Sequence, residues 1–146
     1  MSAIERATIV AAARKWIGTP YRHQASLLHV GCDCLGLVRG VWREILGEEP
    51  EAPPPYASDW AEASGAESLQ RAAERHFRRI DAADFCAGDV LLFRFLDHLP
   101  AKHLGIATDA DHLVHAHDGA CVAEAPLTPQ WRKRIVAAYT FPGVID

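Results

Sequence analysis

Apolar residues recur at helical spacing in two segments of the first third of the chain. The first segment, residues 7–17, follows Ser2 and Glu5, which have the spacing of a capping box. The second segment runs from Cys34 to Gly47, and apolar residues occur in it at three- and four-residue steps: Leu37, Val38, Val41, Trp42 and Ile45. Both patterns predict amphipathic helices.

Residues 58–80 predict a further helix, with Ser64 and Glu67 as a second capping box. After Gly88 the pattern changes to short runs rich in β-branched and aromatic residues. These runs predict strands at 90–95, 103–108, 112–117, 121–124 and 135–141. Helices followed by strands predict an α+β fold with a central, mainly antiparallel sheet. We expect one domain over residues 1–146, because the sequence contains no internal repeat.

Composition and charge exclude several classes of function. With 146 residues, 49% of them hydrophobic, the chain can bury a sizeable core. The formal net charge is -4 with both signs mixed, which argues against nucleic acid as a partner. We expect no membrane span, because no run approaches the roughly 18 apolar residues required. The first residues lack the pattern of a secretory signal, so we expect cytoplasmic synthesis without an export signal.

The four cysteines are not spaced like a disulfide framework. Cys32 and Cys34 are two residues apart, and Cys86 and Cys121 lie inside apolar stretches. We therefore expect four free thiols, with Cys32 packed in a loop and Cys86 and Cys121 in the core.

Cys34 differs from the other cysteines because it begins a predicted helix. A helix N-terminus presents unpaired N–H groups and a partial positive charge. Such an environment favours a thiolate and lowers the pKa of a cysteine. Asp33, directly before Cys34, is a residue type that caps helices. The sequence therefore predicts Cys34 as a nucleophile.

Two histidines flank a predicted turn at Asp109-Ala110-Asp111. If the strands pair as a hairpin centred near residue 109, His103 and His115 lie opposite each other, with Cβ atoms ~5 Å apart. Strand alternation places His112 on the other face. A cysteine, a histidine base and a polar group that orients the base form the general nucleophile triad. We predict that His103 is the base of Cys34 and that His115 orients it.

Five sequence blocks occur in order along the chain: Gly18-Thr19-Pro20-Tyr21-Arg22, Asp33-Cys34-Leu35-Gly36-Leu37-Val38, Gly88-Asp89-Val90-Leu91-Leu92-Phe93, His103-Leu104-Gly105-Ile106 and Leu113-Val114-His115-Ala116. Together they resemble the NlpC-type cell-wall cysteine peptidases, a family with a papain-like cysteine peptidase fold. The resemblance implies the same triad of Cys34, His103 and His115. It also implies that Tyr21 lines the site near the oxyanion, with packing as the alternative role. Leu35 departs from the family, which usually has Ser after the nucleophile, and this bears on the pocket.

The resemblance implies hydrolysis of peptide bonds in peptidoglycan stem peptides, commonly between D-glutamate and diaminopimelate, with no metal or other cofactor. Residues 31–43 and 138–142 are most similar to the subgroup encoded with phage tails and gene transfer agents. This similarity implies phage-tail proteins as partners and a tail-associated protein that acts on the periplasmic cell wall. An amidase or acyltransferase with the same site is an open alternative.

Two other classes of function compete with the peptidase. The first is a zinc protein, because six residues are of zinc-ligand types: Cys32, Cys34, His103, His112, His115 and His117. Their spacing fits structural zinc sites poorly, so we rank this class lower. The second is a non-enzymatic tail component that keeps the fold and binds the cell wall.

Overall fold

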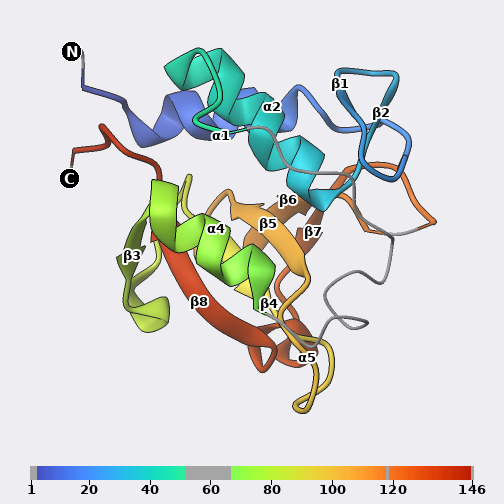
Figure 1. The fold of residues 1–146 in the computed structure, drawn as a ribbon, viewed down its shortest axis with the longest axis vertical. Coiled ribbons are helices and arrows are strands. Elements are labelled where there is room, and N and C mark those ends of the chain that lie inside the picture. Colours follow the sequence, from blue (N-terminus) through green and yellow to red (C-terminus); the bar gives the residue numbers. More distant parts are fainter. Residues whose placement is uncertain (1–2, 52–66, 118, 146) are drawn as a thin grey trace.

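Six strands form the central sheet of the computed structural model, in the order β3-β8-β4-β5-β6-β7 (Figure 1). Every neighbouring pair in this sheet is antiparallel. The strands are β3 (Arg78–Ile80), β4 (Val90–Phe93), β5 (His103–Ala107), β6 (His112–His115), β7 (Ala123–Pro126) and β8 (Ile135–Thr140). The structure describes residues 3–51, 67–117 and 119–145. The predicted α+β class and the antiparallel sheet are confirmed.

The longer helices precede most of the sheet in the chain, as the sequence predicts. They are α1 (Arg6–Arg14), α2 (Cys34–Leu46) and α4 (Ser68–His76). Between α1 and α2 a two-stranded sheet is formed by β1 (Ser26–Leu27) and β2 (Gly31–Cys32). A 3-10 turn, η1 (Ala82–Asp84), follows β3, and a short helix, α5 (Pro129–Arg132), precedes β8. None of the described helices is long and apolar enough to cross a lipid bilayer.

The two faces of the sheet pack against different elements. One face carries Leu92, Leu104 and Val114, which form a core with apolar residues of α1, α2 and α4. The other face carries Leu91, Phe93 and other residues that pack against Trp131 of α5. Because side chains alternate across a strand, neighbouring residues of β4 and β5 enter different cores.

The predicted helix at 58–80 is partly wrong. Of its described residues, 68–76 are helical, and the chain then enters β3. Phe77 is already extended, with φ -116° and ψ 158°, and β3 pairs with β8 as an edge strand. Pairing with β8 therefore overrides the local apolar pattern. Residues 58–66, including Ser64, lie outside the described residues.

The glutamates of the two predicted capping boxes do not make the expected cap hydrogen bonds, so this prediction is wrong for both of them. Glu5 and Glu67 are the N-cap residues of α1 and α4, and neither makes a side-chain cap hydrogen bond. A capping box needs its glutamate at the third helical position instead. The Glu67 carboxylate accepts the Ala101 N–H at 2.9 Å and thus links α4 to the segment before β5. Ser2 lies outside the described residues.

All four cysteines are free thiols, but they differ in burial from the expectation. Cys32 is fully buried, as predicted. Cys86 and Cys121 are exposed, so their assignment to the core is wrong. Both lie outside the strands, which begin at Val90 and Ala123. The apolar residues beside them in the sequence predicted burial, but both cysteines lie in loops that leave them exposed.

Candidate active site

The N-terminus of α2 is fixed by its capping residue, as the sequence predicts. Asp33 is the N-cap, and its Oδ1 accepts the Gly36 N–H at 2.7 Å. Its Oδ2 accepts the Gln24 N–H at 2.8 Å, which fastens the loop before β1 to the helix start. Gly36 allows this arrangement, since a Cβ at that position would collide with the Ala25 carbonyl oxygen.

Cys34 begins α2 and lies against the backbone at the start of β5. Its thiol donates a hydrogen bond to the Lys102 carbonyl oxygen, with 3.7 Å from sulfur to oxygen. The backbone N–H groups of Leu104, Leu35 and Cys34 itself lower the pKa of the thiol, which places them close to the sulfur. The sulfur therefore lies beside the two peptide groups that flank His103. Helix α2 and strand β5 also pack together in the core on one face of the sheet.

The expected thiolate is not the resting state of Cys34. Burial, and then the negative charge of Asp33, raise the pKa of its thiol to about 12. The backbone hydrogen bonds to the sulfur lower that pKa, but their effect is smaller. The stabilisation expected from the helix N-terminus is thus outweighed by desolvation, which penalises the charged form. A neutral thiol must lose its proton to a neighbouring base before it can react.

His103 and His115 form a direct hydrogen bond, with 2.8 Å between His103 Nε2 and His115 Nδ1. Both side chains are buried, at 4% and 8% exposure. The predicted pairing register is nevertheless wrong, because Gly105 and not His103 lies opposite His115. The difference is two residues, and a shift of two keeps every side chain on its face of the sheet. The two imidazoles therefore meet diagonally across the strand pair.

Both imidazoles are held in the neutral form. Burial, followed by electrostatic repulsion between a protonated His103 and His115, His117 and Lys102, lowers the pKa of His103 well below its ordinary value. Burial and the charge of His117 lower the pKa of His115 to about 4. At neutral pH, each ring therefore has one N–H donor and one nitrogen that accepts a proton or hydrogen bond.

Aromatic rings surround this histidine pair. Trp131 of α5 lies 5.4 Å from the His103 ring and 5.3 Å from the His115 ring, measured between centroids. His117 is also in contact with Trp131, at 5.6 Å, and it stacks on His115 at 6.0 Å. The Thr128 hydroxyl caps α5 by accepting the Trp131 N–H. This cluster was not predicted from the sequence, although the Thr128-Pro129 pair is a local signal for the start of α5, the helix that carries Trp131.

Tyr21 is held near Cys34 by backbone pairing. It forms an isolated parallel bridge with Cys32, in which the Arg22 N–H donates to the Cys32 carbonyl at 3.0 Å. The Cys32 N–H donates in turn to the Pro20 carbonyl at 3.1 Å. Tyr21 is half-buried and packs against the same core as Cys34. The two residues thus share one local framework.

Of the six residues proposed as zinc ligands, His103, His115 and His117 are in mutual ring contact. Within residues 3–51, 67–117 and 119–145, no group of three or more His, Cys, Asp or Glu side chains could hold a metal ion. His112 is bonded to Asp109 at 3.0 Å, at the turn end of the β5–β6 hairpin. Cys32 is fully buried, and the Cys34 thiol points to a backbone carbonyl.

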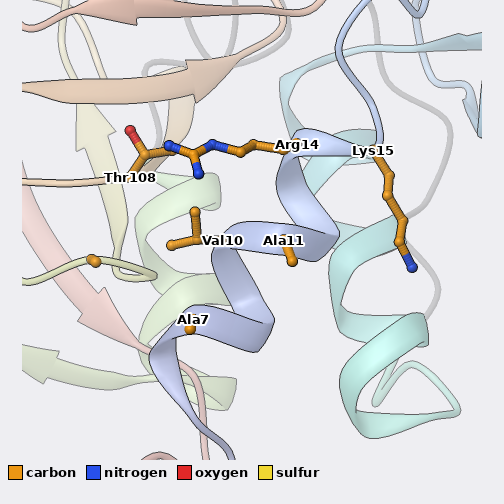
Figure 2. A pocket seen from close by; sticks show the side chains of 7 residues that line it. Ala7, Val10, Ala11, Arg14, Lys15 and Thr108 are labelled. Carbon is orange, nitrogen blue, oxygen red and sulfur yellow. The ribbon is translucent and has the colours of Figure 1, made fainter.

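A shallow hollow lies elsewhere, along the outer side of α1 (Figure 2). It is lined by Ala7, Val10, Ala11, Arg14, Lys15, Ala87 and Thr108. Thr108 follows the last residue of β5, whereas His103 is the first. The hollow is therefore at the other end of that strand from the histidine pair.

Comparison with protein families and solved structures identifies related proteins. A family model described as NlpC/P60 family matches residues 18–140. Comparison with curated proteins gave no match. The NlpC/p60 domain of the peptidoglycan hydrolase SagA has a similar structure, with a TM-score of 0.68 and 24% identity. That likeness covers 94% of this chain and 100% of the SagA domain.

Two further structures share the fold over part of their length. An NlpC/P60 family protein from Bacillus cereus has a TM-score of 0.70 and 15% identity, over 95% of this chain and 41% of that chain. NlpC1 from Trichomonas vaginalis has a TM-score of 0.64 and 18% identity, over 91% of this chain and 42% of that chain. This chain thus spans less than half of either protein.

Proposed function

The chain belongs to the NlpC/P60 family, and on this premise we propose that it is a cysteine peptidase that hydrolyses peptide bonds in peptidoglycan stem peptides. In this proposal Cys34 is the nucleophile, His103 is the base and His115 orients that base. The observation that carries the proposal is the 2.8 Å hydrogen bond between His103 and His115. His103 begins β5, and the carbonyl oxygen of the residue before it, Lys102, accepts the Cys34 thiol. A nucleophile, a base and an orienting group are the parts of an acyl-transfer site.

The hydrogen bond between the imidazoles assigns a role to each ring nitrogen. If His103 Nε2 carries the proton and donates it to His115 Nδ1, then His103 Nδ1 is the basic nitrogen left for the thiol. The low pKa of His115, about 4, supports this arrangement because it keeps His115 an acceptor at neutral pH. When His103 gains a proton, the lone pair of His115 stabilises the imidazolium through the same bond.

In the proposed reaction the thiol leaves the Lys102 carbonyl, and its proton passes to His103 Nδ1. The sulfur attacks the scissile carbonyl carbon and forms a C–S bond, and the carbonyl becomes an oxyanion. The C–N bond then breaks, and His103 returns the proton to the leaving amine. Water, deprotonated by His103, hydrolyses the thioester and restores the thiol. This sequence requires no cofactor.

The start of α2 supplies donors for the oxyanion. The Gly36 N–H is already bound by Asp33, and the Leu37 N–H donates to the Asp33 carbonyl oxygen. The N–H groups of Cys34 and Leu35 lie close enough to the sulfur to lower the pKa of the thiol. We assign the oxyanion to these two donors, with Tyr21 at the edge of the site.

The experiment is a comparison of muropeptide release from purified peptidoglycan. We expect wild-type protein to release peptides with new amino termini, identified by mass spectrometry, and Cys34→Ala to release none. Cys86→Ala is the matched control, because Cys86 is an exposed thiol outside the site. Equal release by wild type and Cys34→Ala, or release by neither, would contradict the proposed peptidase activity. That outcome would favour a non-enzymatic protein that binds the wall.

The tail-associated context remains part of the proposal and rests on the sequence blocks at 31–43 and 138–142 alone. It places the protein with phage-tail proteins and its activity at the periplasmic wall. Detection of the chain in purified tail particles by mass spectrometry would support this context, and its absence from them would remove it.

A further inference from the structure

We propose that the tip of the β1–β2 hairpin, residues 27–30, inserts into the surface of an anionic lipid bilayer. The sequence predicted no function for this segment. The proposal goes beyond the peptidase function and does not depend on it, because Cys34, His103 and His115 take no part in the contact. Figure 1 shows the hairpin at one edge of the molecule, next to the start of α2.

The tip carries exposed aliphatic side chains. Leu27, Leu28 and Val30 are 60%, 36% and 54% exposed. Elsewhere in the described residues, the exposed large apolar side chains are single ones, at Ile17, Leu96 and Ile145. Single exposed apolar side chains are ordinary on protein surfaces, whereas a cluster of them marks a contact with another molecule or with a membrane.

The backbone of the tip is held in a fixed conformation. The Val30 N–H donates to the Leu27 carbonyl oxygen at 3.0 Å and closes a tight turn. Within that turn His29 has φ 65°, a conformation that residues other than glycine rarely adopt. The His29 N–H donates to the hydroxyl of Thr19, a fully buried residue, at 3.1 Å. The protein interior therefore holds the turn, and the tip loses little further freedom when it binds.

The base of the hairpin is attached to α2. Arg43 donates to the Ser26 carbonyl oxygen at 2.7 Å and to the Ser26 hydroxyl at 2.9 Å. The Ser26 hydroxyl donates to the Gly36 carbonyl oxygen at 2.6 Å. Arg43 also pairs with Glu49 at 3.1 Å, so the carboxylate at this end of the hairpin has a cationic partner. Insertion of the tip therefore also orients the start of α2, where Cys34 lies, relative to the membrane.

The charges around the tip favour an anionic surface. Residues 18–32 contain one arginine and two histidines but no aspartate or glutamate, although the whole chain has a formal net charge of -4. The next carboxylate along the chain, Asp33, is buried and caps α2. Arg22 is exposed, and its stem lies across Gly31, where a Cβ would collide with it. Gly31 is the partner of Leu27 in the strand pair. A cation beside exposed aliphatic side chains is the arrangement by which peripheral proteins bind anionic lipids.

The size of the tip favours a bilayer over a second protein. A stable protein–protein interface buries roughly 800 Å² on each partner and takes about 20–30 residues from each. The tip offers three aliphatic side chains on a single turn. Binding at a membrane surface scales with the apolar area that is buried and with the attraction to anionic lipids, so a small tip beside a cation gives weak, reversible binding.

The test is cosedimentation of the purified chain with lipid vesicles. One set of vesicles is phosphatidylcholine alone, and the other is an equal mixture of phosphatidylcholine and phosphatidylglycerol. The hairpin variant is Leu27→Ser/Val30→Ser, which removes two aliphatic side chains of the tip. Leu96→Ser/Ile145→Ser is the matched control, because it removes two exposed aliphatic side chains elsewhere. Arg22→Gln removes the neighbouring charge. Circular dichroism establishes that each variant is folded.

We expect wild type to bind the mixed vesicles about tenfold more tightly than phosphatidylcholine vesicles, and to lose this difference at high salt. The hairpin variant should bind the mixed vesicles at least about tenfold more weakly than wild type, while the matched control keeps the wild-type affinity. Arg22→Gln should weaken binding to the mixed vesicles about fivefold and leave binding to phosphatidylcholine unchanged.

Two results would overturn the membrane site: no binding of wild type to the mixed vesicles, or equal binding by wild type and the hairpin variant. Light scattering without lipid tests a second copy of the chain as the occupant of the tip. A wild-type dimer that the hairpin variant loses would assign the tip to that contact and overturn the proposal. None of these measurements uses muropeptide release, so failure of the peptidase and failure of the membrane site are distinguishable.

Discussion

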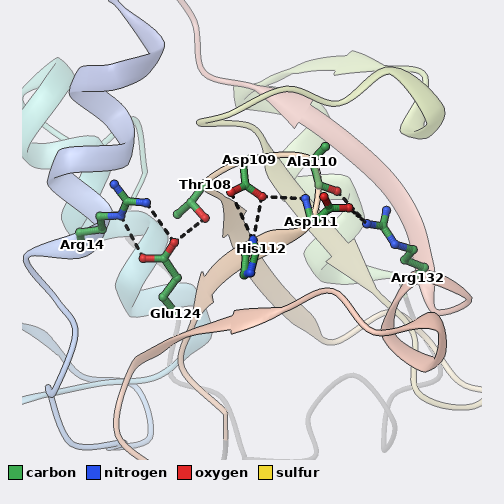
Figure 3. A network of polar contacts seen from close by, with 8 residues as sticks. All are labelled: Arg14, Thr108, Asp109, Ala110, Asp111, His112, Glu124 and Arg132. Atoms are coloured by element: carbon green, nitrogen blue, oxygen red, sulfur yellow. Dashed lines mark hydrogen bonds and ion pairs between the residues drawn. The ribbon is translucent and has the colours of Figure 1, made fainter.

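The β5–β6 hairpin carries histidines at both ends, in opposite environments. At one end His115 is buried and bonded to the imidazole of His103. At the turn end His112 is exposed and bonded to the carboxylate of Asp109 (Figure 3). The same side chain is thus surrounded by aromatic rings at one end and by charged groups and solvent at the other.

The turn end is a network of exposed ion pairs. Arg14 donates to Glu124 at 2.9 Å, and Glu124 also accepts the Thr108 hydroxyl at 2.8 Å (Figure 3). Arg132 pairs with Asp111 at 2.8 Å. Exposed pairs of this kind contribute little to stability, because solvent screens them. In this comparison the burial of the side chain and its hydrogen-bond partner, and not the presence of a histidine, distinguish the proposed base from a surface residue.

The largest expected effect is a difference in activity between variants at the two ends of the β5–β6 hairpin. His103→Asn removes the proposed base, and we expect kcat/KM for a cleaved muropeptide to fall about 1000-fold. His112→Asn, at the turn end, should retain activity and change stability by less than about 0.5 kcal/mol. A kinetic assay of both variants measures this difference. Equal losses in both would mean that the two ends do not differ in function.

The second effect sharpens the role of His115 within the buried end. His115→Phe keeps a ring but removes the acceptor for His103, and we expect about a 100-fold loss of kcat/KM. His115→Asn keeps an acceptor and should lose only about tenfold. The same assay ranks the two variants. If His115→Phe and His115→Asn have the same kcat/KM, His115 contributes only packing.

The smallest effect concerns stability in acid. The pKa of His115 is about 4 in the folded protein, against an ordinary value of 6.5. Below pH 6.5 His115 binds a proton in the unfolded chain but not in the folded protein. The free energy of unfolding therefore falls as the pH falls towards 4. This group contributes a loss of about 2 kcal/mol between pH 7.5 and pH 5.

Urea unfolding at these two pH values measures the loss. The loss should be smaller in His115→Asn than in wild type, and His103 adds to it in the same direction because its pKa is also lowered. His112→Asn should keep the wild-type loss. If wild type and His115→Asn lose the same free energy, the low pKa of His115 is contradicted.

Local features of the site could be predicted from the sequence. The Asp33 cap depends on a residue type next to a helix start, and the shared face of His103 and His115 depends only on strand alternation. The register could not be predicted, because it depends on the turn. The Thr108 N–H donates to the His112 carbonyl at 2.9 Å, and the Asp111 N–H donates to Asp109 at 2.7 Å.

Features that depend on burial or on distant segments were not predictable. The pKa of Cys34 is raised chiefly because other parts of the chain cover it, whereas its position at a predicted helix start indicated a lowered pKa. Trp131 reaches the histidines only when α5 folds onto the sheet. Lys102 is placed by bonds to Phe93 and Cys34, which are nine and 68 residues away. Such contacts have no local pattern.

The cap on α2 also affects the chemical reactivity of Cys34, the proposed nucleophile. Peroxides and alkylating agents react with thiolates far faster than with neutral thiols. Because Asp33 adds its negative charge to the burial of Cys34, almost none of the sulfur is ionised at neutral pH. The neutral thiol of Cys34 therefore reacts slowly with stray electrophiles and oxidants, and in the proposed mechanism its sulfur becomes reactive when His103 removes its proton.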